Sequence, residues 1–539
     1  MKRLLSIFLP VLISLSGNAQ DLAVLGQQKP FIFSGNLTAQ YTFFNTTGVS
    51  YMEPGSWTIS GSPTISIYGV VLPFSFVISE KERSFRQPLN QFGLSPRYKW
   101  ATLHLGYRNL QFSEYSLAGH QILGVGAEIN HPKKINFSVM YGRLLRSVNA
   151  RQPENTAFLQ TPSYTRRCLA LKGGYGDEKN KLNIFYLIAQ DDASSLKNIS
   201  DTLLLKSASN RVMGANTYQT FLKHFIADLE FAASTTDYKL PGESTASIEK
   251  GTVIDFKTGY SANNKRLLLK YLRIEPGFES FGKYFFQRDV RNISIEPGVD
   301  FFKQKLSVDL SLGFQRDHLD NNKSSKTQRK IISGKVTARP WKFYMLNVSI
   351  GNYSIEQSAG LYEPDTAVRL SQATFNATVM NQFNVLMKSM SHSLSLLYSG
   401  QTLSDHNVNT KQFAEFEMTS IAAMYALGFM KLQLQTTASW MLTDYAQNNI
   451  NTRVTGPLFA LSKSFYKTVT TGVSYGNRIT RRDKINTNRT TTIGFNADIR
   501  LHKKHKIGFR YTYNDQKSYI ESIKSFKDKR GDINYAFTF

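Results

Sequence analysis

Long apolar runs are missing from this sequence beyond its first 20 residues. A membrane-spanning helix needs about 20 mainly apolar residues in a row, and no later stretch reaches that length. The mean hydropathy is -0.30, with 41% hydrophobic residues, which is too polar for a bundle of membrane helices. A helical membrane protein is therefore excluded. A polar average is compatible with a barrel, because a barrel strand turns only every second residue to lipid.

Cysteine and acidic residues are also scarce. Cys168 is the only cysteine, so the chain cannot form an internal disulfide. Asp and Glu total 39 against 65 Lys and Arg, which gives a formal net charge of +26. The 9 histidines do not follow the spacing of a zinc protease or a zinc finger, so we expect no metal and no other cofactor. We do not expect an enzyme, because no argument brings a Ser nucleophile and a His onto neighbouring strands.

The amino terminus has the pattern of a secretory signal peptide. Lys2 and Arg3 precede an apolar run, and small residues at 17–19 offer a cleavage site before Gln20. The apolar run is short for a spanning anchor, so we expect residues 1–19 to be a signal peptide and the protein to leave the cytoplasm. In an exported chain the cationic excess favours anionic lipid headgroups, lipopolysaccharide phosphates or acidic solutes as partners, and not nucleic acid.

Apolar and polar residues alternate along much of the chain. From Leu306 to Phe314 every second residue is apolar, and the pattern recurs from Ile493 to Leu501. Such alternation predicts strands with one face in lipid and one in water. A charge on the lipid face would be costly, so charged residues of the other parity are expected to line a lumen. These candidates are Asp228, Glu230, Asp255, Lys257, Asp309, Lys335, Asp498, Arg500 and Arg510.

From residue 131 onward, short turns alternate with longer loops, as in a membrane barrel with short periplasmic turns and longer extracellular loops. We predict an all-β fold, a single antiparallel transmembrane β-barrel of about 24 strands (about 22 to 26) over residues 20–539. A soluble β-sandwich would need a second sheet pattern that the sequence lacks. The predicted short turns lie at 131–134, 177–180, 222–224, 262–265, 302–304, 339–342, 383–388, 427–430, 462–465 and 502–505.

The region before residue 131 is less regular. A first strand is predicted from Leu37 to Phe43, and others at 57–69 and 74–79 with a turn at Pro73, followed by strands at 97–107 and 122–130. The segment 108–119 is either a loop folded into the barrel or an ordinary surface loop. The aromatic and glycine-rich segment 275–286 either folds over or into the pore mouth or contacts the membrane surface.

The last eight residues, Asp532 to Phe539, alternate in the same way, with Tyr535, Phe537 and Phe539 on the apolar side. An aromatic strand that ends the chain resembles the closing strand of bacterial outer-membrane β-barrel proteins, the porin-like barrels among them. The resemblance implies that these three aromatics form the signal read by the barrel-assembly machinery. It also implies a multi-pass barrel in the outer membrane of a Gram-negative bacterium.

Lysine and arginine gather at the predicted outer loops. There they are expected to ring the rim and to pair with lipopolysaccharide phosphates, unless the surface is cationic without a specific ligand. The rim candidates are Arg166, Arg167, Arg329, Lys330, Arg481, Arg482, Lys527, Lys529 and Arg530.

A barrel of this size predicts a channel or conduit for a polar or anionic solute, or for a polymer. The alternative is a non-conducting scaffold that holds partner lipoproteins or a secretion or surface assembly in the outer membrane. A TonB-dependent transporter is disfavoured, because its plug domain would precede the barrel and strand-like alternation already begins at Leu37.

Overall fold

The computed structural model describes residues 30–50, 52–80, 88–149, 162–196, 205–240, 245–285, 287–359, 369–466 and 468–539, so the expected signal peptide lies outside them. One sheet of 29 strand segments accounts for most of this part of the chain. The first segments are short: β1 (Phe31–Ser34), β2 (Asn36–Thr46), β3 (Gly55–Gly61), β4 (Thr64–Ile67), β5 (Val70–Ser79), β6 (Gln91–Leu94), β7 (Arg97–Tyr98), β8 (Ala101–Arg108) and β9 (Ile122–Asn130).

The later strands are longer, as a tilted membrane strand requires. They are β10 (Ile135–Leu145), β11 (Thr165–Gly176), β12 (Asn180–Asp192), β13 (Ser207–Phe221), β14 (Phe225–Lys239), β15 (Ser247–Ala262), β16 (Lys265–Ile274), β17 (Val290–Phe301), β18 (Leu306–Arg316), β19 (Ser325–Ala338), β20 (Tyr344–Ala359), β21 (Ser371–Leu386), β22 (Met390–Asp405), β23 (Phe416–Phe429), β24 (Leu434–Gln447), β25 (Ile450–Phe465), β26 (Val469–Arg482), β27 (Ile485–His502), β28 (His505–Ser518) and β29 (Phe526–Thr538). Two short helical elements, η1 (Ala193–Ser195) and α3 (Lys411–Ala414), lie between strands.

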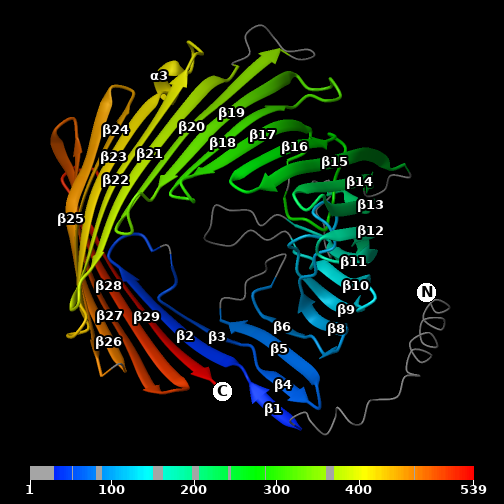
Figure 1. The fold of residues 1–539 in the computed structure, drawn as a ribbon, viewed down its shortest axis with the longest axis horizontal. Helices are drawn as coiled ribbons and strands as arrows, with labels where there is room; N and C mark the ends of the chain where they lie inside the picture. Colours follow the sequence, from blue (N-terminus) through cyan, green and yellow to red (C-terminus); the bar gives the residue numbers. More distant parts are fainter. Residues whose placement is uncertain are drawn as a thin grey trace.

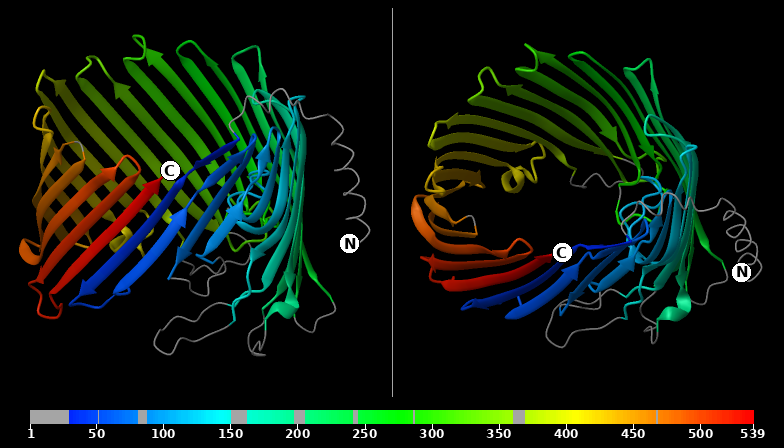
Figure 2. Two further views of the ribbon diagram at one scale, coloured as in Figure 1. Left: turned by 90° about the horizontal axis from the view of Figure 1, so that it is seen from below. Right: turned by 60° about the horizontal axis from the view of Figure 1, so that its bottom comes forward.

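The sheet closes on itself (Figure 1). β29 pairs antiparallel with β2, with Phe537 opposite Leu37, so the last strand closes the barrel against the strand predicted near Leu37. β3 and β4 both pair with β5, so these two segments are parts of one strand. In the same way β1 and β2 form one strand, and β6 and β7 form another. These three divisions reduce the 29 segments to 26 strands. The result is one closed antiparallel barrel of 26 strands, within the predicted range. Figure 2 shows that the strands are tilted around the barrel.

The two ends of the barrel differ in the length of their connections. The last strand ends beside a short turn, since the Thr538 N–H donates to the carbonyl oxygen of Lys504 at 2.8 Å. Three predicted turns, at 383–388, 427–430 and 462–465, begin too early, because β21, β23 and β25 continue to Leu386, Phe429 and Phe465.

Two connections on the long-loop side, 448–449 and 483–484, are hairpins of two residues where longer loops were expected. Asn448, Asn449, Asp483 and Lys484 all have positive φ angles, between 47° and 71°. Two successive left-handed residues form the tight turn that best fits the twist of a hairpin.

The irregular first region departs from the predicted strands in two places. Pro73 lies inside β5, opposite Thr64, and the turn falls earlier, at Tyr68. Residues 97–107 are not one strand, because the chain turns between β7 and β8 at Lys99. Tyr68 and Lys99 have φ angles of 45° and 49°, a conformation that neither residue type signals in a sequence. The strand predicted at 122–130 matches β9.

Alternation gives the barrel an apolar outer face. Leu310 of β18, Ile332 of β19 and Phe495 of β27 are among many large apolar side chains that stand exposed on it. A soluble protein rarely exposes so large an apolar surface, whereas a membrane barrel requires one. In the part of the chain described here, no helix is long and apolar enough to cross a bilayer.

Candidate functional site

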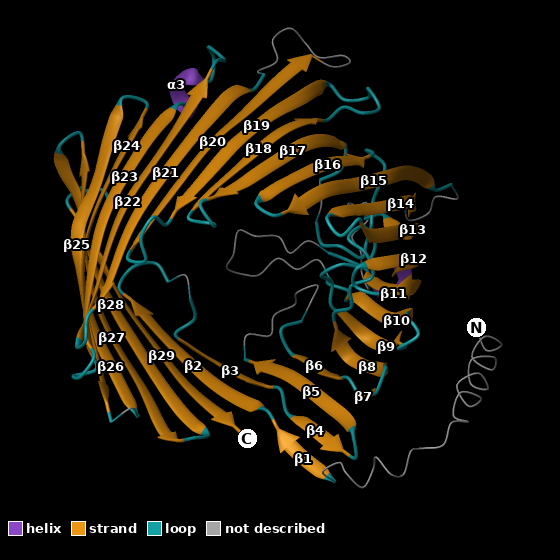
Figure 3. Cartoon of the chain, in the orientation of Figure 1, coloured by secondary structure: helices purple, strands orange, loops and turns teal. Residues whose placement is uncertain are grey.

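Two connections from the long-loop side turn into the barrel, and we call them the inner loops. One, residues 109–121, joins β8 to β9; the other, residues 275–289, joins β16 to β17. Figure 3 shows loop segments inside the ring beside β9 to β15. The Ala118 N–H donates to the carbonyl oxygen of Gly282 at 3.0 Å, so the loops bind each other. The described residues of both segments whose position the sequence left open, 108–119 and 275–285, therefore lie on the lumen side of the wall.

The inner loops cover an apolar patch on the inner wall. Leu117 and Phe278, one from each loop, are fully buried. Burying one such side chain contributes about 1.5–3 kcal/mol, so apolar burial fixes both loops. The buried cluster consists of Leu110, Phe112, Tyr115, Leu117, Ile122, Met140, Leu144, Cys168, Ala170, Phe185, Leu187, Ala189, Ala208, Val212, Ala232, Val253, Ile274, Phe278, Phe281 and Val290.

β12 shows how the sequence provides this patch, because both of its faces are apolar. Ile184 is exposed on the outer face. Phe185 and Leu187, on the opposite face, are at most 1% exposed because the inner loops cover them. A strand with only one covered face would alternate with polar residues here.

A buried amide fastens the second inner loop to the wall. Asn210 of β13 has no exposed surface, and its Nδ2 donates to the carbonyl oxygen of Glu279 at 2.9 Å. Its Oδ1 accepts the Phe281 N–H at 3.1 Å. The same Nδ2 donates to Thr236 Oγ1 at 2.8 Å, so the buried amide has a partner on both sides. Buried polar groups with complete hydrogen bonding hold one specific geometry.

Arg166, which the sequence placed among the rim candidates, points inward. Its Nε and one terminal nitrogen donate to the carboxylate of Asp191 at 2.7 and 2.9 Å. Its guanidinium carbon lies 3.5 Å from the ring centroid of Phe281. Arg166 therefore contacts the second inner loop through a cation–π interaction and has its charge balanced within the lumen.

Two of the predicted lumen carboxylates hold the first inner loop. Tyr115 donates its hydroxyl proton to Asp255 at 2.9 Å and its backbone N–H to Glu230 at 3.2 Å. Burial, followed by the negative charge of Asp255, raises the pKa of Tyr115, so it stays a donor. Lys257 pairs with Asp255 at 3.1 Å.

A polar pocket of about 660 Å³ lies between the first inner loop and the wall. It contains Asp228 and also Lys172 and Lys181, which the sequence analysis did not select. Lys172 Nζ donates to the carbonyl oxygen of Gln111 at 3.2 Å, and no carboxylate among the described residues forms an ion pair with either lysine. The signal that could have found them is their inward parity: Lys172 shares the buried face of β11 with Cys168 and Ala170.

The second inner loop ends at Asp289, which ties it to the neighbouring connection, residues 317–324. The carboxylate accepts the backbone N–H groups of His318 and Leu319 at 3.0 and 2.8 Å and pairs with Lys323. Burial raises the pKa of Asp289, but the Lys323 ammonium and the two N–H groups lower it by more, so it lies below its ordinary value.

The opposite wall differs in character. Four of the eight inward residues of β22 are serines, and those of β21 include Gln372, Thr374, Asn376 and Thr378. All described members of the buried cluster lie between Leu110 and Val290, so none comes from β18 to β29. This wall is polar and only partly buried.

Ion pairs follow the inner face of the open wall. Arg266 Nη2 lies 2.8 Å from Asp309, and its Nη1 lies 2.6 Å from Asp300. Lys506 Nζ lies 3.1 Å from Asp498. The other predicted lumen residues also point inward, because each lies opposite an inward residue of the neighbouring strand. Lys335 of β19 lies opposite Asp309 of β18, Arg500 lies opposite Lys506, and Arg510 lies opposite Asp532.

The predicted rim cations all lie at the long-loop ends of their strands. Alternation turns Arg167, Lys330, Arg481, Lys527 and Lys529 outward and Arg166, Arg329, Arg482 and Arg530 inward. Arg530 pairs with Asp532 at 3.2 Å. Within the described residues, no group of three or more His, Cys, Asp or Glu side chains is placed to hold a metal ion.

No family model matches the sequence, and no curated protein matches it. Solved structures with a similar course of the chain include "Copper transporter OprC", at 8% identity, 94% coverage of this chain, 80% of that chain and a TM-score of 0.39. Pseudomonas aeruginosa OccK10 (OpdN) is 12% identical, with 61% of this chain and 95% of that chain covered and a TM-score of 0.33. The P pilus usher (PapC) translocation pore is 10% identical, with 94% of this chain and 99% of that chain covered and a TM-score of 0.31. At these TM-scores none of them bears on the activity of this chain.

The closed sheet itself determines the class of the protein. Its outer face is apolar, its inner face is polar or covered by inner loops, and its short turns and long loops lie on opposite sides. These are the properties of a barrel that spans the outer membrane. The chain is a large, porin-like outer-membrane β-barrel.

Proposed function

We propose that the barrel conducts polar or anionic solutes, or a polymer, across the outer membrane. The observation that supports this function is the polar wall of β21 and β22, whose inward side chains lack the apolar cover found on β9 to β17. Barrels with many fewer strands than 26 already enclose aqueous channels.

The polar pocket favours an anion as part of the solute. Four carboxylates line it: Tyr115 engages Glu230 and Asp255, Lys283 pairs with Glu114 at 3.1 Å, and Lys257 lies opposite Asp228. Lys172 and Lys181 have no carboxylate partner within the described part of the chain. An ammonium group beside a polar path raises the local concentration of anions.

Planar-bilayer recording of the purified full-length protein tests conduction. Stable single-channel current is expected. Absence of current in every preparation would contradict the proposal and favour a scaffold whose lumen is filled by a partner lipoprotein or a secretion assembly.

Ion selectivity tests the role of the two lysines. The Lys172→Gln and Lys181→Gln double variant should shift the reversal potential in a KCl gradient toward cation selectivity. Lys431→Gln and Lys503→Gln, both in short turns, remove the same charge away from the pocket and serve as the matched control. Equal shifts in the two double variants would contradict an anion site at the pocket.

A further inference from the structure

A row of three arginines crosses the outer face of the barrel. Arg273, Arg291 and Arg316 lie directly opposite one another in β16, β17 and β18. They share the parity of the outward residues Leu269 and Leu312, so their side chains lie on the lipid side. Adjacent strands are about 4.8 Å apart, and like charges placed directly opposite repel each other.

The row has little compensation from the protein. Arg273 lies 3.4 Å from Glu275, but neither Arg291 nor Arg316 has an ion pair or a side-chain hydrogen bond with any described residue. The Nε atoms of Arg273 and Arg316 are buried without a hydrogen-bond acceptor. Arginine Nε and terminal N–H groups fit the paired oxygens of a phosphate.

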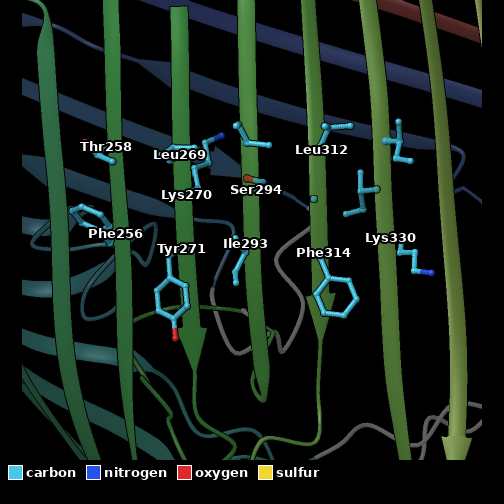
Figure 4. Close-up of a pocket in the computed structure, with 14 residues that line it drawn as sticks. Phe256, Thr258, Leu269, Lys270, Tyr271, Ile293, Ser294, Leu312, Phe314 and Lys330 are labelled. Carbon is cyan, nitrogen blue, oxygen red and sulfur yellow. The ribbon is translucent and has the colours of Figure 1, made fainter.

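An apolar groove of about 690 Å³ begins two residues along each strand from the row, at the next outward side chains. Tyr271, Ile293, Phe314 and Lys330 form its first level on four neighbouring strands, as Figure 4 shows. Leu269, Ile295, Leu312 and Ile332 form the next level. Lys330 adds a fourth cation at the side of the groove.

The order of these groups matches the order of groups in a lipid. The arginine row adjoins the inner loop 275–289 and the connection 317–324, so it lies at the long-loop rim, and the groove extends from it toward the middle of the barrel wall. Long loops face the outside in barrels of this class. Cations at the interface and an apolar groove beneath them fit phosphates above acyl chains.

The length of the arginine row indicates which kind of lipid headgroup can contact all of its cations. From Arg273 to Arg316 the row covers two strand spacings, about 10 Å, and Lys330 extends it to about 14 Å. One phosphate group cannot contact cations over that distance, whereas two phosphates separated by sugar rings can. We infer that Arg273, Arg291, Arg316 and Lys330 bind the phosphates of an outer-leaflet glycolipid of the lipid A type, with an acyl chain in the groove between Tyr271 and Ile332.

Native mass spectrometry of the full-length protein in detergent tests this site, with lipid A carrying two phosphates as the probe. The wild type should retain it at least tenfold more tightly than the Arg291→Gln and Arg316→Gln double variant. The matched control is the Arg211→Gln and Arg453→Gln double variant, since these outward arginines already pair with Asp237 and Asp444. The control should stay within twofold of the wild type.

A second comparison uses only the wild-type protein and therefore does not depend on whether a variant assembles. Lipid A with one phosphate should bind several-fold more weakly than lipid A with two, and phosphatidylglycerol should not displace either. Equal binding of the two lipid A forms, or displacement by phosphatidylglycerol at equal concentration, would overturn the inference. This site is independent of conduction, so a silent bilayer recording would leave it standing.

Discussion

Replacing Phe278 by alanine should detach the second inner loop while the barrel stays assembled. Phe278 is fully buried against the inner wall, and its ring meets the ring of Tyr115 edge to face at 6.4 Å between centroids. Truncating a buried Phe to Ala costs about 3–5 kcal/mol. The strand ladders of β16 and β17 do not include this residue, so the cost falls on the closed state of the loop.

At about 1.4 kcal/mol per factor of ten, that loss raises the open fraction of the loop by roughly 10² to 4 × 10³. Hydrogen–deuterium exchange at the Phe281 amide, which donates to Asn210, measures the change directly. Phe285→Ala is the matched control, because Phe285 lies on the same loop and is 83% exposed. If Phe278→Ala and Phe285→Ala exchange at the same rate there, burial of Phe278 does not fix the loop.

Three further outcomes follow from the geometry. Leu310→Lys places a charge on the lipid face at a cost of about 2–4 kcal/mol near the midplane and should reduce heat-modifiable barrel on a denaturing gel, whereas Ser311→Lys should be tolerated. The lowered pKa of Asp289 means that its stabilising contacts are complete above about pH 4 and are lost as the pH falls through its folded pKa, so the protection of the amides of residues 317–324, measured relative to their intrinsic exchange rates at each pH, should fall on acidification in the wild type but not in Asp289→Asn. Arg166→Gln removes the cation from the Asp191 carboxylate, which keeps the Ala208 N–H as a donor, and should lower stability by about 3 kcal/mol, the low end of the range for a broken buried pair, with Asp191→Asn restoring part of it in urea unfolding of the reconstituted barrel.

Much of the barrel could be predicted because apolar and polar residues alternate along most of its strands. The stretch from Leu306 to Phe314 became part of β18, and Asp532 to Phe539 closes the barrel against β2. In these stretches one face meets lipid and the other meets water, so alternation is visible in the residues. Alternation also predicts that Asp309 and Asp498 face the lumen, because a charged side chain is costly on the lipid face.

The inner loops could not be predicted, because the strands that they cover do not alternate between apolar and polar residues. The β12 residues 184–189 are apolar on both faces, and nothing in the residues says that one face meets lipid and the other a loop of the same chain. The partners of that inner face are far away in sequence: Gly282 lies against Leu187. For the same reason the sequence predicts Arg166 as a rim cation, whereas in the fold it contacts Phe281 and Asp191.

The lumen is therefore asymmetric, and this asymmetry decides which charges a solute meets. On the covered side Glu230 and Asp255 bind Tyr115, and Arg166 binds Asp191, so their charges act on the protein itself. On the open side, no described residue of β18 to β29 belongs to the buried cluster that the two inner loops form with the wall. A solute in the barrel would pass the wall from β18 to β28, where Lys335, Arg500 and Arg510 stand among serine, threonine and asparagine side chains. Conduction should consequently respond to charge changes at these three residues more than to changes at Glu230, whose loss should act through the first inner loop.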